Sequence, residues 1–377
     1  MIRTLRLCWL LILLAAVGCR HHGVVPAGNI PRAKVAAQSC TENLVENANC
    51  EAVAPIRPAA NVLVLSGGGM YGAYSAGVLA GWTQNGTRPE FDVVTGVSTG
   101  SLIGVAAFLG PKYDPIAREF YTTIKASDVY TLRAWVQIPW ADAVATSRPL
   151  KKLIDNVVDE NLLAAVAREH RKGRRFYVGT THLEARKLAV WDMGAIACQG
   201  PGAIDKFRDV LLASSSVPGV LPPVRLTCTR EGKACSELHA DGGTTASLFV
   251  PQGLIAPAPN GGPSGTNVYV IVAGKLFADP GKVRSRVLPV LSASANSIVY
   301  ASARAEIATI HHLSRLAGAN FHLTAVPAGD PADPMGLAFD PKEMSRLYEV
   351  GYCQTVSGPA WMTSPPFESS ATDPIRE

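Results

Sequence analysis

The feature that most constrains the fold is a strand–turn–helix unit that occurs twice near the start of the chain. Asn61–Ser66 is a short apolar run that ends in three glycines, and a helical pattern follows from Gly72 to Trp82. Phe91–Val97 is the next expected strand, and Thr99–Leu109 is the next helix. A strand, a helix and a second strand in this order form a parallel pair with a right-handed crossover. The sequence therefore predicts an α/β fold: a three-layer α/β/α sandwich with a mostly parallel central sheet.

The rest of the chain continues this alternation. We expect further helices over Asp114–Lys125, Pro149–Val158, Leu162–Arg171, Ile204–Ser214, Leu288–Leu316 and Lys342–Val356, and strands over Arg175–His182, Lys187–Met193, Val268–Gly274 and Phe321–Val326. Apolar residues make up 47% of the chain and charged residues 17%, which supports a large core and argues against global disorder. The densest basic run, Arg168 to Arg175, is interpreted as a solvated helix end and loop, so no nucleic-acid partner is expected.

Residues 1–18 have the pattern of an export signal. Two arginines precede the apolar run Leu7–Val17, which is too short to span a bilayer comfortably but is typical of a signal-peptide core. Small residues then lead into Cys19. This arrangement resembles the signal of bacterial lipoproteins, in which the cysteine becomes the lipid-modified N-terminus; an ordinary secretory signal is the alternative. By the same resemblance, Arg20 favours the outer membrane of a bacterial cell envelope, with the protein facing the periplasm.

The chain divides into four parts on this interpretation. They are a signal peptide (1–18), a lipidated cysteine with a tether (19–60), a folded domain (61–360) and a flexible tail (361–377). The even number of cysteines after Cys19 favours disulfides in an exported chain. Closeness in sequence suggests the pairs Cys40–Cys50 and Cys228–Cys235, which leaves Cys198–Cys353, although other pairings stay open. No His/Cys cluster has zinc-ligand spacing, and we expect no metal and no cofactor.

A glycine-rich segment follows the first expected strand. Ser66–Gly72 reads SGGGMYG, and such a turn presents backbone N–H groups that can hold a phosphate or the oxyanion of an acyl intermediate. It lacks the Gly-Lys-Ser/Thr of a Walker loop. A dinucleotide-binding fingerprint through Gly67, Met70 and Gly72 is the first alternative.

Two further motifs carry a nucleophile and a carboxylate. Gly96–Gly100 reads GVSTG, and the pattern GxSxG between a strand and a helix is typical of a nucleophile elbow. The elbow exposes the Ser98 oxygen at a helix N-terminus, where negative charge is favoured. Asp241–Gly243 reads DGG and places a carboxylate in a tight loop, or forms a plain turn.

Taken in this order, these motifs resemble those of the patatin-like phospholipases. Ala213–Pro223 (ASSSVPGVLPP) resembles the segment that precedes the aspartate of that family, and the resemblance covers about Asn61 to Gly274. It implies a serine esterase of the phospholipase A or lysophospholipase type, acting on acyl esters of lipids with a Ser-Asp dyad. The residues it implies are Ser98 (nucleophile), Asp241 (base), Gly67, Gly68, Gly69, Met70 and Gly72 (oxyanion hole), and Gly96, Gly100, Gly242 and Gly243 (elbow and aspartate turn).

Two alternatives stay open at this point. A serine triad would need a histidine after the acid, and His311, His312 and His322 are available, although His311-His312 is interpreted as a partly exposed surface pair. A catalytically weak or inactive lipid-binding scaffold is the other, since fold does not guarantee function. It gains weight from Tyr71, which stands where the family usually has Arg or Lys.

Overall fold

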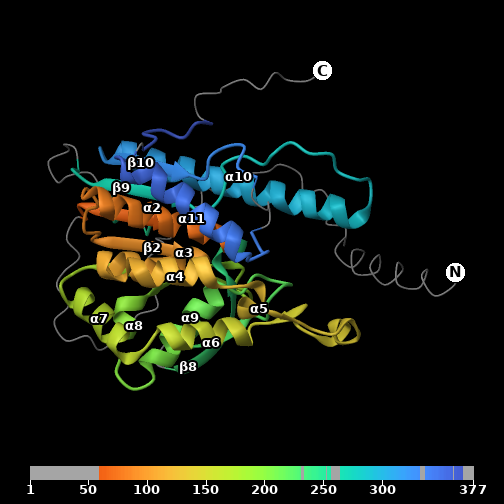
Figure 1. Cartoon of the computed structure of the whole chain (residues 1–377). Helices are drawn as coiled ribbons and strands as arrows, with labels where there is room; N and C mark the ends of the chain where they lie inside the picture. The colour runs from red at the N-terminus through yellow and green to blue at the C-terminus, as the bar shows by residue number, and fades with distance from the viewer. Residues whose placement is uncertain are drawn as a thin grey trace, which may run out of the picture. The chain divides into compact units, whose positions relative to one another are not determined.

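An eight-stranded sheet forms the centre of the protein (Figure 1). The structure, a computed structural model, describes residues 59–230, 233–251, 253–255, 264–331, 336–359 and 361–367. The expected signal peptide, lipidated Cys19, most of the tether and the Cys40–Cys50 pair lie outside these described residues. All of the described residues belong to one unit, Ser39–Glu377.

Five neighbouring strands of the sheet are parallel. The strands of the sheet are β1 (Asn61–Leu65), β2 (Val93–Val97), β5 (Arg175–His182), β6 (Lys187–Asp192), β7 (Val224–Arg230), β8 (Lys233–Asp241), β9 (Asn267–Val272) and β10 (Asn320–Ala325). Their order is β10-β9-β1-β2-β5-β8-β7, and β6 also pairs with β5. The row from β10 to β5 is parallel, whereas β6, β7 and β8 run antiparallel to their neighbours. The predicted mostly parallel sheet is therefore confirmed, and the β7–β8 hairpin is an addition that the sequence analysis missed.

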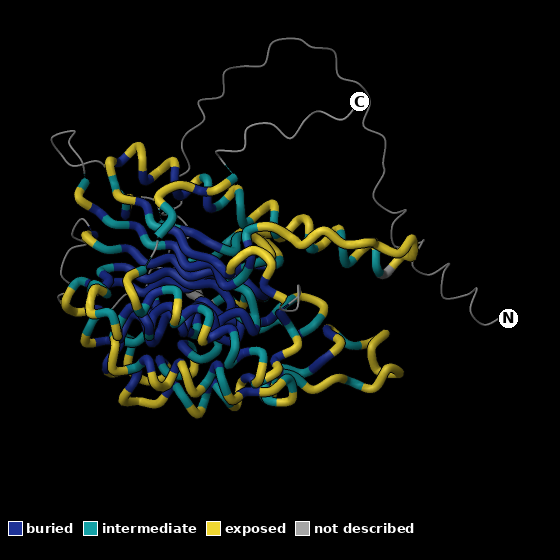
Figure 2. The backbone as a smooth tube through the Cα atoms, turned by 45° about the horizontal axis from the view of Figure 1, so that its top comes forward, coloured by how far each residue is buried: buried dark blue, intermediate teal, exposed yellow. Residues whose placement is uncertain are grey.

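Helices cover both faces of the sheet, as a three-layer fold requires. The helices are α2 (Gly72–Asn85), α3 (Thr99–Leu109), α4 (Asp114–Thr123), α5 (Ala126–Val129), α6 (Arg148–Val157), α7 (Glu160–Arg171), α8 (Met193–Ala197), α9 (Ala203–Ser214), α10 (Val287–Leu316) and α11 (Pro341–Val356). Alternate residues of a strand point to opposite faces. Leu63 and Leu65 of β1 pack in a core with α2, α3, α9 and α11, whereas Val62 and Val64 pack in a second core with α10. Figure 2 shows the buried residues concentrated along the strands between these layers.

Helices α2 and α11 pack at very short range through glycines. A Cβ on Gly77 of α2 would collide with the carbonyl of Tyr348 in α11, and a Cβ on Gly351 of α11 would collide with the carbonyl of Tyr74 in α2. The hydroxyl of Thr355 adds a 3.0 Å hydrogen bond to a carbonyl of α2. The last helix of the domain therefore holds the helix that follows the glycine-rich loop.

Two expectations about surface residues are wrong. The basic run does not end in solvent: Arg174 is buried, pairs with Glu169 at 3.0 Å and lies over the Phe108 ring at 4.7 Å. Burying the apolar stem of an arginine while its charge is paired explains this placement. His311 is buried as well and lies 4.9 Å from the Phe321 ring, whereas His312 is exposed, so only one of the expected surface pair lies at the surface.

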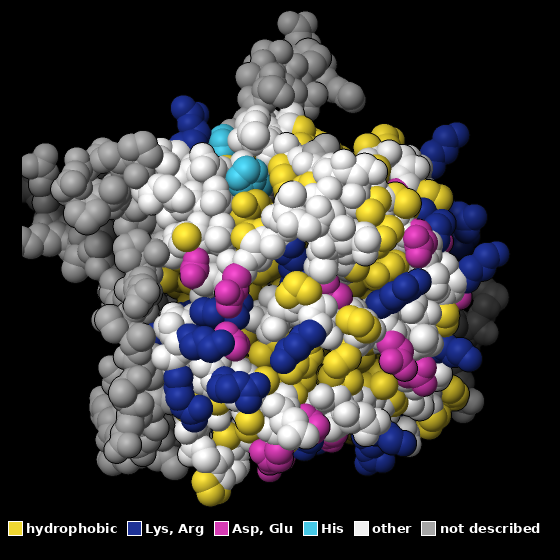
Figure 3. All heavy atoms as spheres, turned by 60° about the vertical axis from the view of Figure 1, so that its left-hand side comes forward, with side chains coloured by type: hydrophobic (Ala, Val, Ile, Leu, Met, Phe, Trp, Pro, Cys, Tyr) yellow, Lys and Arg dark blue, Asp and Glu magenta, His cyan; other side chains and the backbone are white. Residues whose placement is uncertain are grey.

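The charged surface and the cysteines complete the comparison with the sequence. The face of the molecule in Figure 3 carries Lys and Arg interspersed with Asp and Glu, without a field of one sign.

Among the described residues, Cys198 and Cys353 do not form the disulfide that elimination suggested. Cys235 is disulfide-bonded and lies opposite Cys228 in the β7–β8 ladder. Within the described part of the chain, no helix is both long enough and apolar enough to cross a membrane.

Candidate active site

Ser98 lies in a sharp turn between β2 and α3, as the GxSxG pattern predicts. Its backbone has φ 53° and ψ −126°, a conformation that side-chain-bearing residues rarely adopt. The turn is held by a hydrogen bond from the Ser98 N–H to the Ser214 hydroxyl (2.9 Å) and by one from the Ser101 hydroxyl to the Ser98 carbonyl (2.6 Å). A Cβ on Gly96 would collide with the carbonyl of Gly100, so this elbow requires glycine at its start.

Strand pairing brings Asp241 to the same place. Val97, the last residue of β2, pairs with Gly179 of β5, and Asp241, the last residue of β8, pairs with Thr180 of β5. Strand β6 pairs with both of these β5 residues and therefore occupies the other edge of β5. The ends of β2 and β8 consequently meet head to head on one edge of β5. Asp241 thus ends a strand, rather than sitting in a plain Asp-Gly turn, and directly faces the Ser98 elbow.

The carboxyl group of Asp241 accepts a hydrogen bond from the Ser98 side chain. Its other close donor is the N–H of Gly243, at 2.7 Å. Burial raises the pKa of the Asp241 carboxyl to about 6, and the two hydrogen bonds oppose this shift by stabilising the ionised form. The Asp241 carboxyl is therefore mostly ionised at neutral pH, and its pKa is close enough to neutrality for it to take up a proton.

The glycine-rich loop lies beside Ser98 and is fixed by close backbone contacts. A Cβ on Gly67 would lie 3.1 Å from the Cβ of Ser98. A Cβ on Gly68 would collide with the carbonyl of Ala273, and one on Gly69, which has φ 56°, with the carbonyl of Gly336. The loop therefore cannot carry side chains at these positions without moving its neighbours.

Two N–H groups of this loop differ from the others. Gly67 donates its N–H to the carbonyl of Ser247 (3.3 Å), and Met70 donates its N–H to the carbonyl of Gly336 (2.8 Å). Gly72 donates to the carbonyls of Gly69 and Met70, in the short 3₁₀ turn before α2. No backbone acceptor among the described residues receives the N–H of Gly68 or Gly69. The expected set of oxyanion donors therefore narrows to Gly68 and Gly69.

Ser214, from the Ala213–Pro223 segment, and Glu306, which lies outside the motifs, hold these parts in place. The Ser214 hydroxyl, which accepts from Ser98, donates to the carbonyl of Gly179 (2.8 Å). The carboxylate of Glu306 in α10 accepts the N–H groups of Ser247 (3.0 Å) and Leu248 (2.9 Å). Burial raises the pKa of Glu306 to about 7, against these two hydrogen bonds. The sequence analysis missed Glu306, whose only signal was a lone acid in a long helix otherwise poor in charge.

Of the histidines that a serine triad could use, His322 lies far from Ser98. His322 of β10 lies opposite Tyr269 of β9, which lies opposite Leu63 of β1. Leu63 in turn lies opposite Val94 of β2, so three strand spacings separate His322 from β2. His322 is therefore about 13 Å from Ser98 along the strands and about 14 Å across them. On β8, His239 contacts the hydroxyl of Thr180 at 2.9 Å and the carboxylate of Glu237 at 3.4 Å.

An apolar hollow lies among α3, α4, α6, α7 and α9. Tyr121 forms one wall of the hollow. Its hydroxyl hydrogen-bonds to the hydroxyl of Thr99, the residue after Ser98, and lies 3.1 Å from the Thr99 carbonyl. The lining side chains come from α3, α4, α6, α7 and α9 and the turn before α4: Leu102, Ile103, Val105, Ala106, Tyr113, Ile116, Ala117, Phe120, Tyr121, Ile154, Val157, Val158, Leu162 and Leu211. Such a lining accommodates hydrocarbon and excludes charged groups.

Tyr71, which departs from the resembled pattern, packs against the segment at Gly336. Its side chain is buried, and a Cβ on Gly336 would lie 3.2 Å from the Tyr71 ring. The same Gly336 accepts the N–H of Met70 through its carbonyl, so Tyr71 packs against the segment that fixes the glycine-rich loop. Within the described residues, no cluster of three or more His, Cys, Asp or Glu side chains could hold a metal ion.

Comparison with known proteins places this site in a family. A search of curated protein sequences finds no match for this chain. Among solved structures, VipD from Legionella pneumophila is similar with 12% identity and a TM-score of 0.40, over 80% of this chain and 66% of that one. The family model described as patatin-like phospholipase matches residues 63–253, which include Ser98, Asp241 and the glycine-rich loop. The chain belongs to the patatin-like phospholipase family.

Proposed function

We propose that the protein hydrolyses acyl esters of lipids, with Ser98 as nucleophile and Asp241 as its base. The observation that carries this proposal is the hydrogen bond between the Ser98 side chain and a buried carboxyl whose pKa is about 6. A base with a pKa just below neutral is ionised in most molecules and still binds a proton strongly enough to assist the reaction. Family membership supports the lipid substrate class.

Acylation follows from this geometry. The Ser98 oxygen attacks the ester carbonyl carbon while its proton passes to the Asp241 carboxylate. The carbonyl oxygen gains a negative charge and accepts hydrogen bonds from the N–H groups of Gly68 and Gly69. The intermediate then collapses, and the protonated Asp241 returns the proton to the departing alkoxide. The products are a free alcohol and an acyl group esterified to Ser98.

Deacylation uses the same groups with water in place of the alcohol. Asp241 takes a proton from water as its oxygen attacks the acyl carbonyl, and the same two N–H groups hold the second oxyanion. Collapse breaks the bond to Ser98, whose oxygen recovers the proton from Asp241, and a fatty acid leaves. We propose that the acyl chain lies in the apolar hollow beside α3, whose wall residue Tyr121 bonds to Thr99, the neighbour of Ser98.

Hydrolysis by the purified full chain tests the proposal. The wild type, Ser98→Ala and Ser357→Ala are compared on a short-chain nitrophenyl ester and on phospholipid vesicles, with Ser357 as an exposed serine control. We expect activity in the wild type and in Ser357→Ala, and none in Ser98→Ala. Absence of activity and of fluorophosphonate labelling at Ser98 in the folded wild type would instead favour the lipid-binding scaffold.

We also propose that Cys19 carries a lipid anchor and that the protein lies on the bacterial cell envelope. The support is the export-signal pattern of residues 1–18 and the small residues before Cys19. Several acyl chains on one cysteine would anchor the protein firmly, because each buried CH₂ contributes about 0.8 kcal/mol. Mass spectrometry of the membrane-extracted protein should show a lipidated N-terminal Cys19. An unmodified mature N-terminus at another residue would replace this anchor with an ordinary secretory signal.

A further inference from the structure

An exposed arm projects from the domain between α5 and α6. Its base is a two-stranded ladder, β3 (Thr131–Leu132) with β4 (Ala145–Thr146), and its tip is the short helix η5 (Trp135–Trp140). The tip exposes 81% of Trp135 and 87% of Trp140, and Leu132 is 68% exposed. The arm's charges, Arg133 and Asp142, pair with each other at 3.1 Å. Tryptophans exposed to this degree mark a binding surface, because an aromatic ring of this size is normally buried.

The first half of α10 is a second apolar projection. From Val287 to Ala303 the helix has no Asp, Glu, Lys or Arg. Val287 is 73% exposed, Leu291 59% and Ile298 66%. Figure 2 shows this half of the helix extending beyond the buried core, with exposed and half-buried residues along its length. A helix with so many exposed apolar side chains is stable when a further partner covers it.

Both projections are joined to the catalytic elements. At the base of the arm, the N–H groups of Val144 and Ala145 donate to the carbonyls of Gly219 (2.9 Å) and Val220 (3.0 Å), just after the segment that supports Ser98 and Asp241. The segment leading to α10 begins at Ala273, against the glycine-rich loop. Figures 1 and 2 show both projections extending to the same side of the domain. They therefore flank the edge of the sheet where Ser98 lies.

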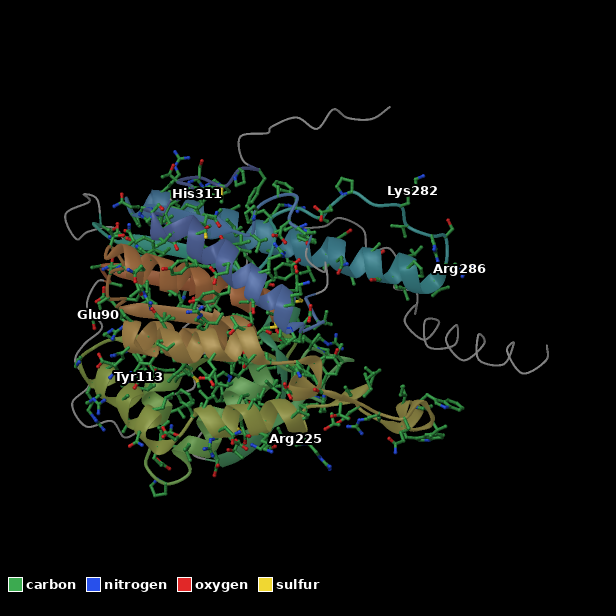
Figure 4. All side chains as sticks on the ribbon, viewed as in Figure 1. Glu90, Tyr113, Arg225, Lys282, Arg286 and His311 are labelled. Atoms are coloured by element: carbon green, nitrogen blue, oxygen red, sulfur yellow. The ribbon has the colours of Figure 1, made fainter. Side chains whose placement is uncertain are left out.

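Charge indicates what covers these projections. Lys282, Arg284 and Arg286 are all exposed in the segment before α10, and the one nearby acid, Asp279, pairs with Lys275. Figure 4 shows Lys282 and Arg286 at the outer end of the projecting helix. A second copy of the chain would bring the same positive charges together and be repelled. Exposed tryptophans, an apolar helix and adjacent cations together match the interface of an anionic lipid bilayer.

We propose that Leu132–Trp140 and Lys282–Ala303, together named the docking surface, bind an anionic lipid bilayer and hold the Ser98 edge of the domain against it. The apolar side chains enter the boundary between headgroups and acyl chains, and the three cations contact anionic headgroups. That this contact delivers a substrate rests on the proposed function, whereas the binding itself does not depend on catalysis. A lipid on Cys19 would keep the protein near a membrane, and the docking surface orients it there.

The test uses the full chain with Ser98→Ala and Cys19→Ala, so that neither hydrolysis nor lipidation contributes. Vesicles contain equal parts of phosphatidylcholine and phosphatidylglycerol, with brominated acyl chains that quench tryptophan on contact. We expect strong quenching that disappears when Trp135→Ala and Trp140→Ala are added. The matched control is Leu316→Ala, an exposed apolar residue at the other end of α10. Equal quenching with and without the two tryptophans would overturn the proposal.

The cations are tested by the preference for anionic over neutral vesicles. Each Lys or Arg near an anionic surface adds to binding, so removing all three as Lys282→Gln, Arg284→Gln and Arg286→Gln should lower this preference about 100-fold. The control variant removes three positive charges at the C-terminal end of α7, as Arg168→Gln, Arg171→Gln and Lys172→Gln. It should change the preference for anionic vesicles little. An unchanged preference in the first triple variant would contradict lipid docking.

Two readouts separate this inference from the proposed function. Sedimentation of the tryptophan variants without lipid reports any self-association, and a dimer that requires Trp135 and Trp140 would reassign the surface to a second copy. Hydrolysis of a soluble nitrophenyl ester by chains that retain Ser98 reports the catalytic pair alone. We expect the docking variants to keep that activity and to lose at least about 10-fold on anionic vesicles. Full activity of these variants on vesicles would overturn the role of the docking surface in catalysis.

Discussion

The side chain of Ser98 hydrogen-bonds to the carboxyl of Asp241 because the strands that carry them end head to head on one edge of β5. One strand runs parallel to β5 and the other antiparallel, so the two ends meet without a long loop. The contact is thus set by backbone pairing in the sheet and depends little on the flexibility of either side chain.

The pH dependence of hydrolysis should report the Asp241 carboxyl. Burial raises its pKa to about 6, and only the ionised form can take the proton of Ser98. We therefore expect kcat/KM for a soluble ester to fall tenfold per pH unit below an apparent pKa near 6. A profile that stays flat to pH 4 would show that Asp241 is not the base.

Replacing Asp241 by Asn should abolish hydrolysis and stabilise the fold. A carboxyl whose pKa is raised from 3.8 to about 6 on folding binds protons more tightly in the folded state, so its ionisation destabilises that state as pH rises through this range. Asp241→Asn should raise the free energy of unfolding by up to about 3 kcal/mol at pH 8 and by almost nothing below pH 4. Denaturant melts at the two pH values measure this, and a variant less stable at pH 8 would contradict the assigned cause.

Gly68→Ala should remove activity through the backbone of the oxyanion loop. The added methyl group would collide with the carbonyl of Ala273, and the loop must move to relieve the collision. Displacing one oxyanion donor costs roughly 10²–10³-fold in kcat. Gly281→Ala is the matched control, because a Cβ there meets nothing within 4 Å and its backbone suits any residue. Equal kcat in both variants would show that the loop does not hold the oxyanion.

Glu306 should act by positioning the segment that follows the catalytic aspartate. Glu306→Gln keeps an oxygen that can accept the N–H groups of Ser247 and Leu248, whereas Glu306→Ala leaves both without that acceptor. We expect near-normal kcat for the first variant and a loss of about 10-fold or more for the second. Because burial raises the pKa of Glu306 from 4.5 to about 7, ionisation of this carboxyl lowers the stability of the wild type as pH rises through that range, and the Gln variant should lack this fall. Identical kcat in the two variants would assign Glu306 no positioning role.

Local sequence patterns account for much of this molecule and fail where distant segments meet. The bounds of α3 and β5 match the expectation to the residue, because glycine turns and apolar periodicity define both locally. The hairpin of β7 and β8 was missed although Val224 and Leu226 alternate with polar residues, because β8 contains Lys, Ala, Glu and Asp, which are depleted in strands. The burial of Arg174 was also missed, since only the tertiary fold brings Glu169 and Phe108 to it.

The sequence motifs identified the parts of the site but not their relative positions. The elbow glycines and the DGG motif are local requirements of tight backbone turns, and they can be read from the chain. The engagement of the Met70 N–H by Gly336 depends on a segment far along the chain. The same holds for Glu306 and for the exposed arm, which carry no local signature of their role.

The glycine-mediated contact between α2 and α11 joins a segment that is made early in synthesis to one that is made late. Helix α2 directly follows the oxyanion loop, and its partner α11 begins only at Pro341. A ribosome therefore completes the serine elbow, the aspartate strand and the glycine-rich loop long before it produces the helix that holds that loop in place. We expect a nascent chain, or one that stops before residue 341, to contain Ser98, Asp241 and the glycine-rich loop and still to hydrolyse no ester.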